Sequence, residues 1–255
     1  MCLFYLSYMS HEKYPLIIAA NRDEFYERSS APACFWTDNP GVMGGRDLQG
    51  GGTWFGMTKA GRIAAVTNFR DLASVKPDGP SRGMLVRDFL CSSVPAEDYL
   101  RELRQCCSEY SGFNIIVGTV DSLYYFSNMG ESIFRIPPGS HCVSNNFLNV
   151  PWPKVARSKA LLDGLIAGCD DPVPDEMFSV LGDRSRPDDR LLPDTGVGLE
   201  WERVLSSIFI GTEVYGTRSS TVVLIDRERT VTFIERAYGQ GGEPGETLTH
   251  RFPLE

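Results

Sequence analysis

The sequence predicts an α+β fold built on antiparallel β-sheets, and two observations lead to that prediction. Short apolar runs are separated by tight polar or glycine-containing turns, which is the pattern of a β-meander. Predicted strands and helices also come in separate groups along the chain: strands, helices, strands, helices and strands again. Such grouping favours helices layered on antiparallel sheets over the one-for-one alternation that builds parallel sheets.

Apolar runs and turn residues define the strands. In the first quarter of the chain, a polar turn at Ser10–Lys13 joins the first two runs, and Lys59–Gly61 forms a hairpin turn between the next two. Two glycine clusters, Gly44-Gly45 and Gly50–Gly52, precede the third run. The predicted strands are Leu3–Tyr8, Pro15–Ala20, Thr53–Met57, Arg62–Phe69, Phe113–Val117, Ser122–Phe126, Ser132–Ile136, His141–Val143, Ile208–Ile210, Ser219–Ile225 and Thr230–Glu235.

Helical spacing of apolar residues predicts helices between these strands. The first follows the start signal Pro80-Ser81 and places Leu85 and Phe89 on one side. The stretch Asp183–Gly198, rich in Pro, Asp and Arg, is expected to be a surface loop, and the tail from Gly239 is expected to be irregular. The predicted helices are Arg82–Leu90, Ala96–Cys107, Lys154–Ile166 and Asp175–Leu181.

Composition narrows the class of protein. A net charge of −8 argues against a nucleic-acid or anionic-membrane partner, which would need clustered Lys and Arg. No apolar run approaches the roughly 20 residues that span a bilayer, and no secretory or transit signal is visible, so no transmembrane segment is expected. The seven cysteines are odd in number and scattered, which indicates reduced thiols and a cytoplasmic location.

Organisation and metal binding can be predicted from the same survey. The three histidines lie far apart and no C-x-x-C occurs, so no metal site is expected. No internal repeat or interdomain linker is visible in the chain. Residues 1–255 are therefore predicted to form a single domain.

Cys2 is the residue that most strongly suggests chemistry. It stands directly before the first predicted strand, and removal of Met1 would leave a thiol and a free α-amine on one residue. An α-amine with an ordinary pKa of about 7.7–8.0 could act as the general base for a thiol with an ordinary pKa of about 8.5. The alternative is that Cys2 is a small apolar residue at a strand start, as most unpaired cysteines are.

Polar residues gather at the ends of several predicted strands. Asp23 could accept a hydrogen bond from the Cys2 α-ammonium, and Arg22 could lower the thiol pKa or bind a substrate carboxylate. The Asn68 amide could donate to a developing oxyanion, and Arg218 could hold a carboxylate or phosphate. Each of these residues also has a simpler explanation as a solvated turn, a turn cap or a surface residue. The carboxamides Asn21, Asn145 and Asn146 likewise follow predicted strands.

Seven short motifs together resemble one family closely. The resemblance is to the NRDE family, whose best-known member is transport and Golgi organisation protein two, and it spans nearly the whole chain. It implies a fold similar to N-terminal-nucleophile hydrolases, which is a four-layer α-β-β-α sandwich of two antiparallel sheets. The motifs are Met1-Cys2, Ala20–Phe25, Gly45–Asp47, Gly51–Trp54, Thr67-Asn68, Ser144–Asn146 and Tyr215–Arg218.

The resemblance also implies roles for individual residues. Cys2 would be the nucleophile, Asp23 would orient its amine, and Asn68 would be the oxyanion donor. Those hydrolases carry an arginine three residues before the aspartate, where this chain has Ala20. Arg22 or Arg218 could fill that space. The implied catalytic residues are Cys2, Asp23, Asn68 and Asn145, and the implied substrate-binding residues are Arg22, Asn21, Asn146 and Arg218.

Two functions of different classes follow from the resemblance. One is a hydrolase or acyl transferase that acts on an amide or thioester in a pocket around Cys2 and requires no cofactor. The alternative is a carrier without turnover that binds haem or an acyl lipid as cargo, with Cys2, His11 or His141 available to the haem iron. A purely scaffolding role is a third reading. The family's roles in haem trafficking, lipid homeostasis and secretory-pathway organisation imply that a cytoplasmic chain could associate with mitochondria or Golgi membranes.

Overall fold

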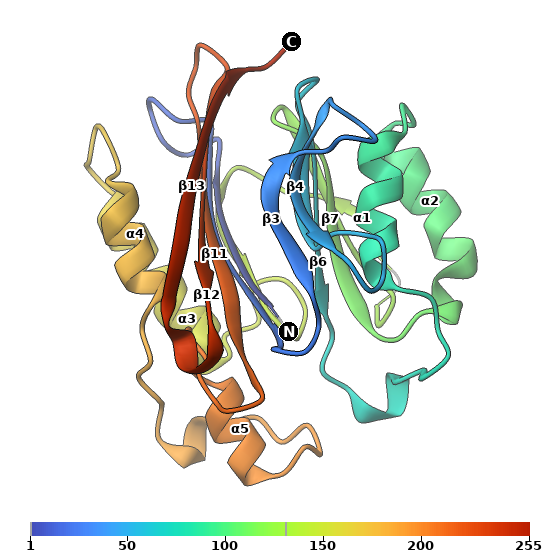
Figure 1. Ribbon diagram of the computed structural model, residues 1–255, viewed down its shortest axis with the longest axis vertical. Helices are drawn as coiled ribbons and strands as arrows, with labels where there is room; N and C mark the ends of the chain where they lie inside the picture. Colours follow the sequence, from blue (N-terminus) through green and yellow to red (C-terminus); the bar gives the residue numbers. More distant parts are fainter. Residues whose placement is uncertain (1, 131) are drawn as a thin grey trace. The chain divides into compact units, whose positions relative to one another are not determined.

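The computed structural model describes residues 2–130 and 132–255 and confirms an α+β protein with two antiparallel sheets and accompanying helices (Figure 1). The described residues divide into two compact units, each built on one sheet. The first unit comprises residues 2–27 and 138–251, and the second comprises 28–130, 132–137 and 252–255. Each unit combines stretches from distant parts of the sequence, so the units are not successive domains. The prediction of a single domain stays a prediction.

The first unit is built on a six-stranded sheet in the order β10-β1-β2-β11-β12-β13. Helices α3 and α4 pack on this sheet, with α3 against β1 and β10 and α4 against β2 and β11. A short helix, α5, precedes β11 in the chain (Figure 1). The elements are β1 (Cys2–Tyr8), β2 (Leu16–Phe25), β10 (Gly139–Val143), α3 (Pro153–Ile166), α4 (Pro174–Leu181), α5 (Leu199–Leu205), β11 (Tyr215–Ile225), β12 (Thr230–Tyr238) and β13 (Pro244–Pro253).

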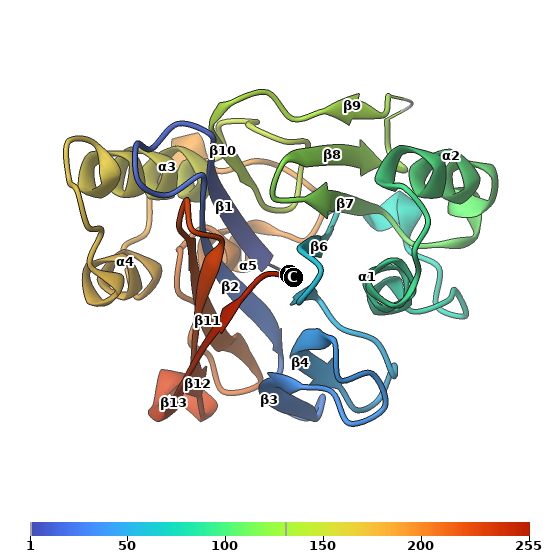
Figure 2. The ribbon, with the colours of Figure 1, turned by 90° about the horizontal axis from the view of Figure 1, so that it is seen from above.

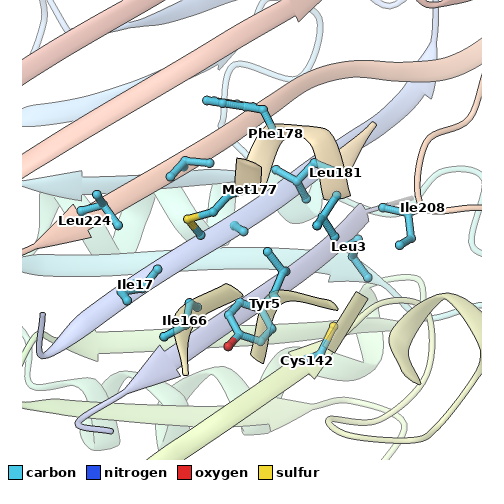
Figure 3. Close-up of a cluster of buried hydrophobic side chains, with 14 of the residues drawn as sticks. Leu3, Tyr5, Ile17, Cys142, Ile166, Met177, Phe178, Leu181, Ile208 and Leu224 are labelled. Carbon is cyan, nitrogen blue, oxygen red and sulfur yellow. The ribbon is translucent and has the colours of Figure 1, made fainter. Parts of the chain in front are cut away.

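Alternation along the strands builds the core of the first unit. Leu3 and Tyr5 of β1 point to the same face as Ile17 of β2, because successive side chains of a strand point to opposite faces. Met177 and Phe178 of α4 pack against that face, and Figure 3 shows these side chains converging in one cluster. Each fully buried side chain of this size contributes roughly 1.5–3 kcal/mol. This packing holds β1 and β2, and therefore their ends, in a fixed register.

The second unit is a seven-stranded sheet in the order β3-β4-β5-β6-β7-β8-β9. Helix α1 packs on β5, β6 and β7, and helix α2 packs on β7 and β8 (Figure 2). The elements are β3 (Ser30–Phe35), β4 (Val42–Asp47), β5 (Phe55–Thr58), β6 (Arg62–Asn68), α1 (Arg82–Cys91), α2 (Ala96–Cys106), β7 (Phe113–Thr119), β8 (Ser122–Ser127) and β9 (Phe134–Arg135).

Several elements differ from the sequence-based prediction. The strand expected at Ile208–Ile210 is wrong, because this segment is an irregular connection to β11. The tail expected to be irregular forms β13 instead; most of its side chains are exposed, so it has no apolar alternation to reveal it. Strands β3 and β4 and helix α5 were not predicted. In β4, Gly44 lies so close to β5 that a Cβ would stand 2.7 Å from the Phe55 carbonyl oxygen, and glycine there suggests a turn in sequence alone.

Candidate active site

Strand register brings Cys2 and the predicted arginines to one end of the first unit's sheet. Cys2 of β1 pairs with Arg22 of β2, and Arg22 pairs in turn with Ser219 of β11. Directly opposed residues of antiparallel strands point to the same face, so the Arg22 side chain lies beside the thiol. The register of β11 shifts between Thr217 and Ser219, and such a bulge re-aims the residue it contains, which is Arg218.

The Cys2 thiol is half-buried and experiences opposing influences. Burial raises its pKa, because the surrounding protein disfavours the thiolate. The Asp23 carboxylate raises the pKa further, while the Arg22 guanidinium and the backbone N–H of Asp23 lower it. The thiol therefore needs an acceptor for its proton if it is to act as a nucleophile.

Asp23 is buried and held from two sides. Its side chain has an exposed fraction of 0%, and its Oδ1 accepts a 2.8 Å hydrogen bond from the Thr217 hydroxyl. Its Oδ2 lies 3.8 Å from Nζ of Lys154, a lysine whose side chain is only 2% exposed. Burial raises the pKa of Asp23, while Lys154 and the hydroxyl lower it. Sequence reasoning missed Lys154, because its contact with Asp23 joins residues that lie far apart in the chain.

The carboxamide Asn145 is brought next to the first residues of β1. Val143 of β10 pairs with Phe4, so the residues after Val143 run alongside Cys2. The Ser144 hydroxyl donates to the Cys2 carbonyl at 2.8 Å and lies 3.0 Å from Asn145 Oδ1. Asn145 is fully buried, which fits a fixed donor in the site. Asn146 is half-buried, and its Oδ1 accepts from the N–H of the next residue, as in a local turn.

Arg218 is the second guanidinium at this end of the sheet, and its charge acts on Arg22. Its Nη1 donates to the carbonyls of Phe25 and Tyr26 at 3.0 and 3.1 Å, and its Cζ lies 5.5 Å from the centre of the Tyr26 ring. Burial lowers the pKa of Arg218, and the positive charge of Arg22 lowers it further. Two guanidiniums close enough to repel one another are the arrangement expected for a site that binds an anion.

Two other predicted residues lie elsewhere or are otherwise engaged. Asn21 is buried, and its Nδ2 donates to the carbonyls of Leu181 and Ile208 at 2.8 and 2.9 Å. Its Oδ1 accepts from Ser220 at 2.6 Å, so these bonds favour a structural role over the expected substrate contact, which stays a prediction. Asn68 is the last residue of β6 in the second unit, and its role as oxyanion donor also stays a prediction.

A cavity of about 770 Å³ lies at the other end of β1 from Cys2. Its lining includes Asp163, whose carboxylate accepts from Tyr5 at 2.8 Å and from Ser140 at 3.0 Å. His11 also lines it, with Nε2 2.7 Å from the Cys169 carbonyl and Nδ1 accepting two backbone N–H groups. The pocket around Cys2 stays a prediction, because this cavity is lined by other residues.

Three observations bear on ligands and membranes. Among the residues that the structure describes, no group of three or more His, Cys, Asp and Glu side chains could hold a metal ion. Both ring nitrogens of His11 are engaged as above, which disfavours His11 as a haem ligand. Nδ1 of His141 lies 3.0 Å from Asn149 Nδ2, and a hydrogen bond at one ring nitrogen is compatible with metal binding through the other. No helix within residues 2–130 and 132–255 is long and apolar enough to cross a bilayer.

Comparison with known proteins supports these observations at the level of family and fold. The family model described as Transport and Golgi organisation 2 matches residues 1–240. The Transport and Golgi organization protein 2 homologs of Bos taurus and Homo sapiens are 34% and 32% identical to this chain, over the whole of each chain. Among solved structures, a mutant of the conjugated bile acid hydrolase from Clostridium perfringens gives a TM-score of 0.52 at 11% identity, covering 100% of this chain and 98% of that one. The last similarity shows a shared fold.

Proposed function

We propose, from the premise that this chain belongs to the Transport and Golgi organisation 2 family, that it is a cysteine hydrolase or acyl transferase acting on amides or thioesters. The Cys2-to-Arg22 register carries this proposal, because it sets the Cys2 thiol beside a cation. The next residue of β2, Asp23, is a buried carboxylate whose charge also acts on the thiol. The fold shared with a bile acid hydrolase supports the same reaction class. The finer assignment to a substrate rests on the chemistry of the site.

The proposed reaction uses the α-amine that removal of Met1 leaves on Cys2. The amine takes the thiol proton as the sulfur attacks the acyl carbon, and the carbonyl electron pair moves to the oxygen. When the oxyanion collapses, the C–N or C–S bond breaks and the leaving amine or thiol takes the proton from the α-ammonium. Water then attacks the thioester with the amine again as base, which releases a carboxylic acid and restores the thiol; an acceptor amine or thiol in place of water gives acyl transfer.

The other residues of the site have supporting parts in this proposal. Asp23 accepts a hydrogen bond from the α-ammonium and holds it toward the sulfur. Asn145 holds the segment that follows β10 in place beside Cys2. Asn68 is proposed as the oxyanion donor, and loss of such a donor costs on the order of 10²–10³ in rate. Arg22 and Arg218 bind an anionic group of the substrate. Acyl substrates with a carboxylate or phosphate are therefore the class to test first.

The first test compares Cys2→Ala with wild type on a panel of anionic amides and acyl thioesters. We expect kcat/KM to fall by on the order of 10³-fold or more, because the nucleophile is lost. Cys34→Ser is the matched control, since Cys34 is an exposed cysteine of the second unit, and it should retain wild-type turnover. Turnover that survives Cys2→Ala contradicts the mechanism. N-terminal peptide mass spectrometry on the same samples shows whether Met1 is present.

The carrier alternative makes a different prediction in the same material. A carrier for haem would show no turnover on the panel and would shift the Soret band when titrated with haem. Of the ligands considered for the iron, His11 is disfavoured because both of its ring nitrogens are hydrogen-bonded, so Cys2 is the ligand to test first. A Soret shift in wild type that disappears in Cys2→Ala would favour the carrier over the hydrolase.

A further inference from the structure

Lys154 is a buried cation that has no role in the reaction proposed above. It stands in the first turn of α3, and its side chain is 2% exposed. Its Nζ lies 3.8 Å from Oδ2 of Asp23, whose side chain is fully buried. Lysine is almost never buried to this degree unless it is paired with a charge, so the pair with Asp23 explains where Lys154 lies.

The position of Lys154 in its helix is unfavourable for a cation. Helix α3 begins at Pro153, so Lys154 is among the residues whose backbone N–H groups form the positive end of the helix dipole. Burial and the dipole both disfavour the ammonium there. Solvent offsets neither cost, and the interaction with the Asp23 carboxylate opposes both.

Lys154 and Thr217 together fix the Asp23 carboxylate. The backbone N–H of Ile210 donates to the Thr217 hydroxyl oxygen at 2.9 Å, and this directs the hydroxyl hydrogen toward Asp23 Oδ1. Lys154 approaches the other oxygen, Oδ2. Thr217 therefore holds one carboxylate oxygen by a hydrogen bond, and the charge of Lys154 acts on the other from 3.8 Å. The backbone N–H of the same residue, Asp23, acts on the Cys2 sulfur.

We propose that Lys154 is a positioning residue that keeps the Asp23 carboxylate ionised and fixed, so that Asp23 can hold the Cys2 α-ammonium. This inference rests on the proposed function, because it concerns the same nucleophile. Without the lysine, burial favours the protonated, neutral acid, which no longer accepts a charge-assisted bond from the ammonium. The α-ammonium then loses its proton at lower pH, and the alkylation profile of Cys2 moves with it.

The test combines two titrations on the full-length protein. Carbon-13 NMR of labelled aspartate carboxyls, with Asp23→Asn to assign the signal, follows the Asp23 titration. Alkylation by iodoacetamide, read by peptide mass spectrometry, follows Cys2 across the same pH range. The variants are Lys154→Met, which removes the charge at similar length, and Lys154→Arg, which keeps it. Lys159→Met is the matched control, because Lys159 lies on the same helix and pairs with Asp163 instead.

We expect Lys154→Met to raise the Asp23 midpoint by at least about one pH unit, which is a tenfold change in its acid constant. The Cys2 alkylation profile should shift in the same variant, while Lys154→Arg and Lys159→Met stay close to wild type. The double variant Lys154→Met with Asp23→Asn leaves no uncompensated charge and should fold if the single variant does not. In that event, the Cys2 alkylation profile of the double variant is compared with that of Asp23→Asn. Equal profiles support the inference that Lys154 acts through Asp23, and a further shift in the double variant overturns it.

Two results would overturn the inference. An Asp23 midpoint that is the same in Lys154→Met and wild type shows that Lys154 does not control its ionisation. A shifted midpoint with an unchanged Cys2 profile shows that the pair is purely structural. Failure of the proposed function is distinguishable from both, because it appears in wild type, as a retained Met1 or a Cys2 that alkylates like an ordinary thiol. The carboxyl titration then still decides whether Lys154 controls Asp23.

Discussion

Two lysines of helix α3 form ion pairs that differ in environment. Near its start, Lys154 approaches Asp23 at 3.8 Å, with side chains 2% and 0% exposed. One and a half turns later, Lys159 approaches Asp163 at 2.9 Å, with side chains 32% and 37% exposed. The shorter pair is the solvated one, so distance alone does not rank them. Burial distinguishes the two pairs. Water screens the Lys159–Asp163 pair, whereas the buried charges of Lys154 and Asp23 are not screened by water.

The difference in burial between the two ion pairs matches their different positions in the fold. Asp163 also accepts from Tyr5 and Ser140, and it ties β1, β10 and α3 together beside a cavity. Asp23 lies behind the strand end that carries Cys2, where a buried charge has a use in chemistry. A costly buried pair is a stronger sign of function than a solvated pair, which needs no such explanation.

The largest expected effect on stability separates these two pairs. Lys154→Met leaves the Asp23 side chain buried without its cation, so that it must either stay charged without this partner or take up a proton at neutral pH. We expect this variant to lower the free energy of unfolding by about 3–5 kcal/mol. Lys159→Met should cost less than about 1 kcal/mol, because solvent replaces the lost partner. Urea unfolding of both variants at neutral pH makes the measurement. Equal losses of unfolding free energy in the two variants would show that burial does not separate the two ion pairs.

A smaller effect is expected at the thiol. Arg22→Gln removes the cation opposite Cys2, so the pKa of the thiol rises further and its alkylation at neutral pH should slow by about tenfold. Arg227→Gln is the control, since Arg227 lines the cavity at the other end of the sheet. The rate constant for alkylation of Cys2, measured by peptide mass, checks this. Burial raises the pKa of Cys142 to about 12, so Cys142 should stay unmodified and serves as an internal reference.

The smallest expected effect is a pair of opposite pH dependences. Burial raises the pKa of Asp23 above its unfolded value of about 3.9, so its contribution to stability is greatest below that pH and falls as pH rises through the raised pKa. Burial also acts on Asp163, but hydrogen bonds from Lys159, Tyr5 and Ser140 outweigh it and lower the pKa. Its contribution is therefore present above about pH 3.9 and is lost as pH falls through the lowered pKa.

Urea unfolding of Asp23→Asn and Asp163→Asn across the acidic range measures these two slopes. The stability of wild type relative to Asp23→Asn should decrease as pH rises. The stability of wild type relative to Asp163→Asn should increase as pH rises. Slopes of the same sign would show that the two carboxyls do not differ in the way their surroundings indicate.

Much of the fold could be predicted from the sequence, and the parts that could not share a physical cause. Strands β1, β2, β6, β7 and β8 and helices α1 to α4 are confirmed, because their apolar residues follow the period of the element. Strand β4 was missed because its close approach to β5 requires glycine, and β13 because most of its side chains are exposed. These strands depend on neighbours distant in sequence, which local pattern does not contain.

The candidate site was predictable to a similar extent. Cys2, Arg22 and Asp23 were singled out, and the register pairs Cys2 with Arg22. The predicted strand ended at Ala20, whereas β2 continues through Arg22 and Asp23 to Phe25. Lys154 was not found, because its value comes from a contact with a residue 131 positions away that no local pattern encodes (154 − 23 = 131). One signal was present: a lysine in the first turn of an apolar helix, where the dipole disfavours a cation.

Trapping of an acyl-enzyme tests most directly whether Cys2 is the nucleophile. Wild-type protein is mixed with an acyl thioester that carries a carboxylate, quenched in acid and digested, and the N-terminal peptide is weighed. We expect one acyl group on Cys2, in a peptide that lacks Met1, and no such group in Cys2→Ala. An N-terminal peptide that stays unacylated while the thioester is turned over would contradict the assignment of Cys2 as the nucleophile.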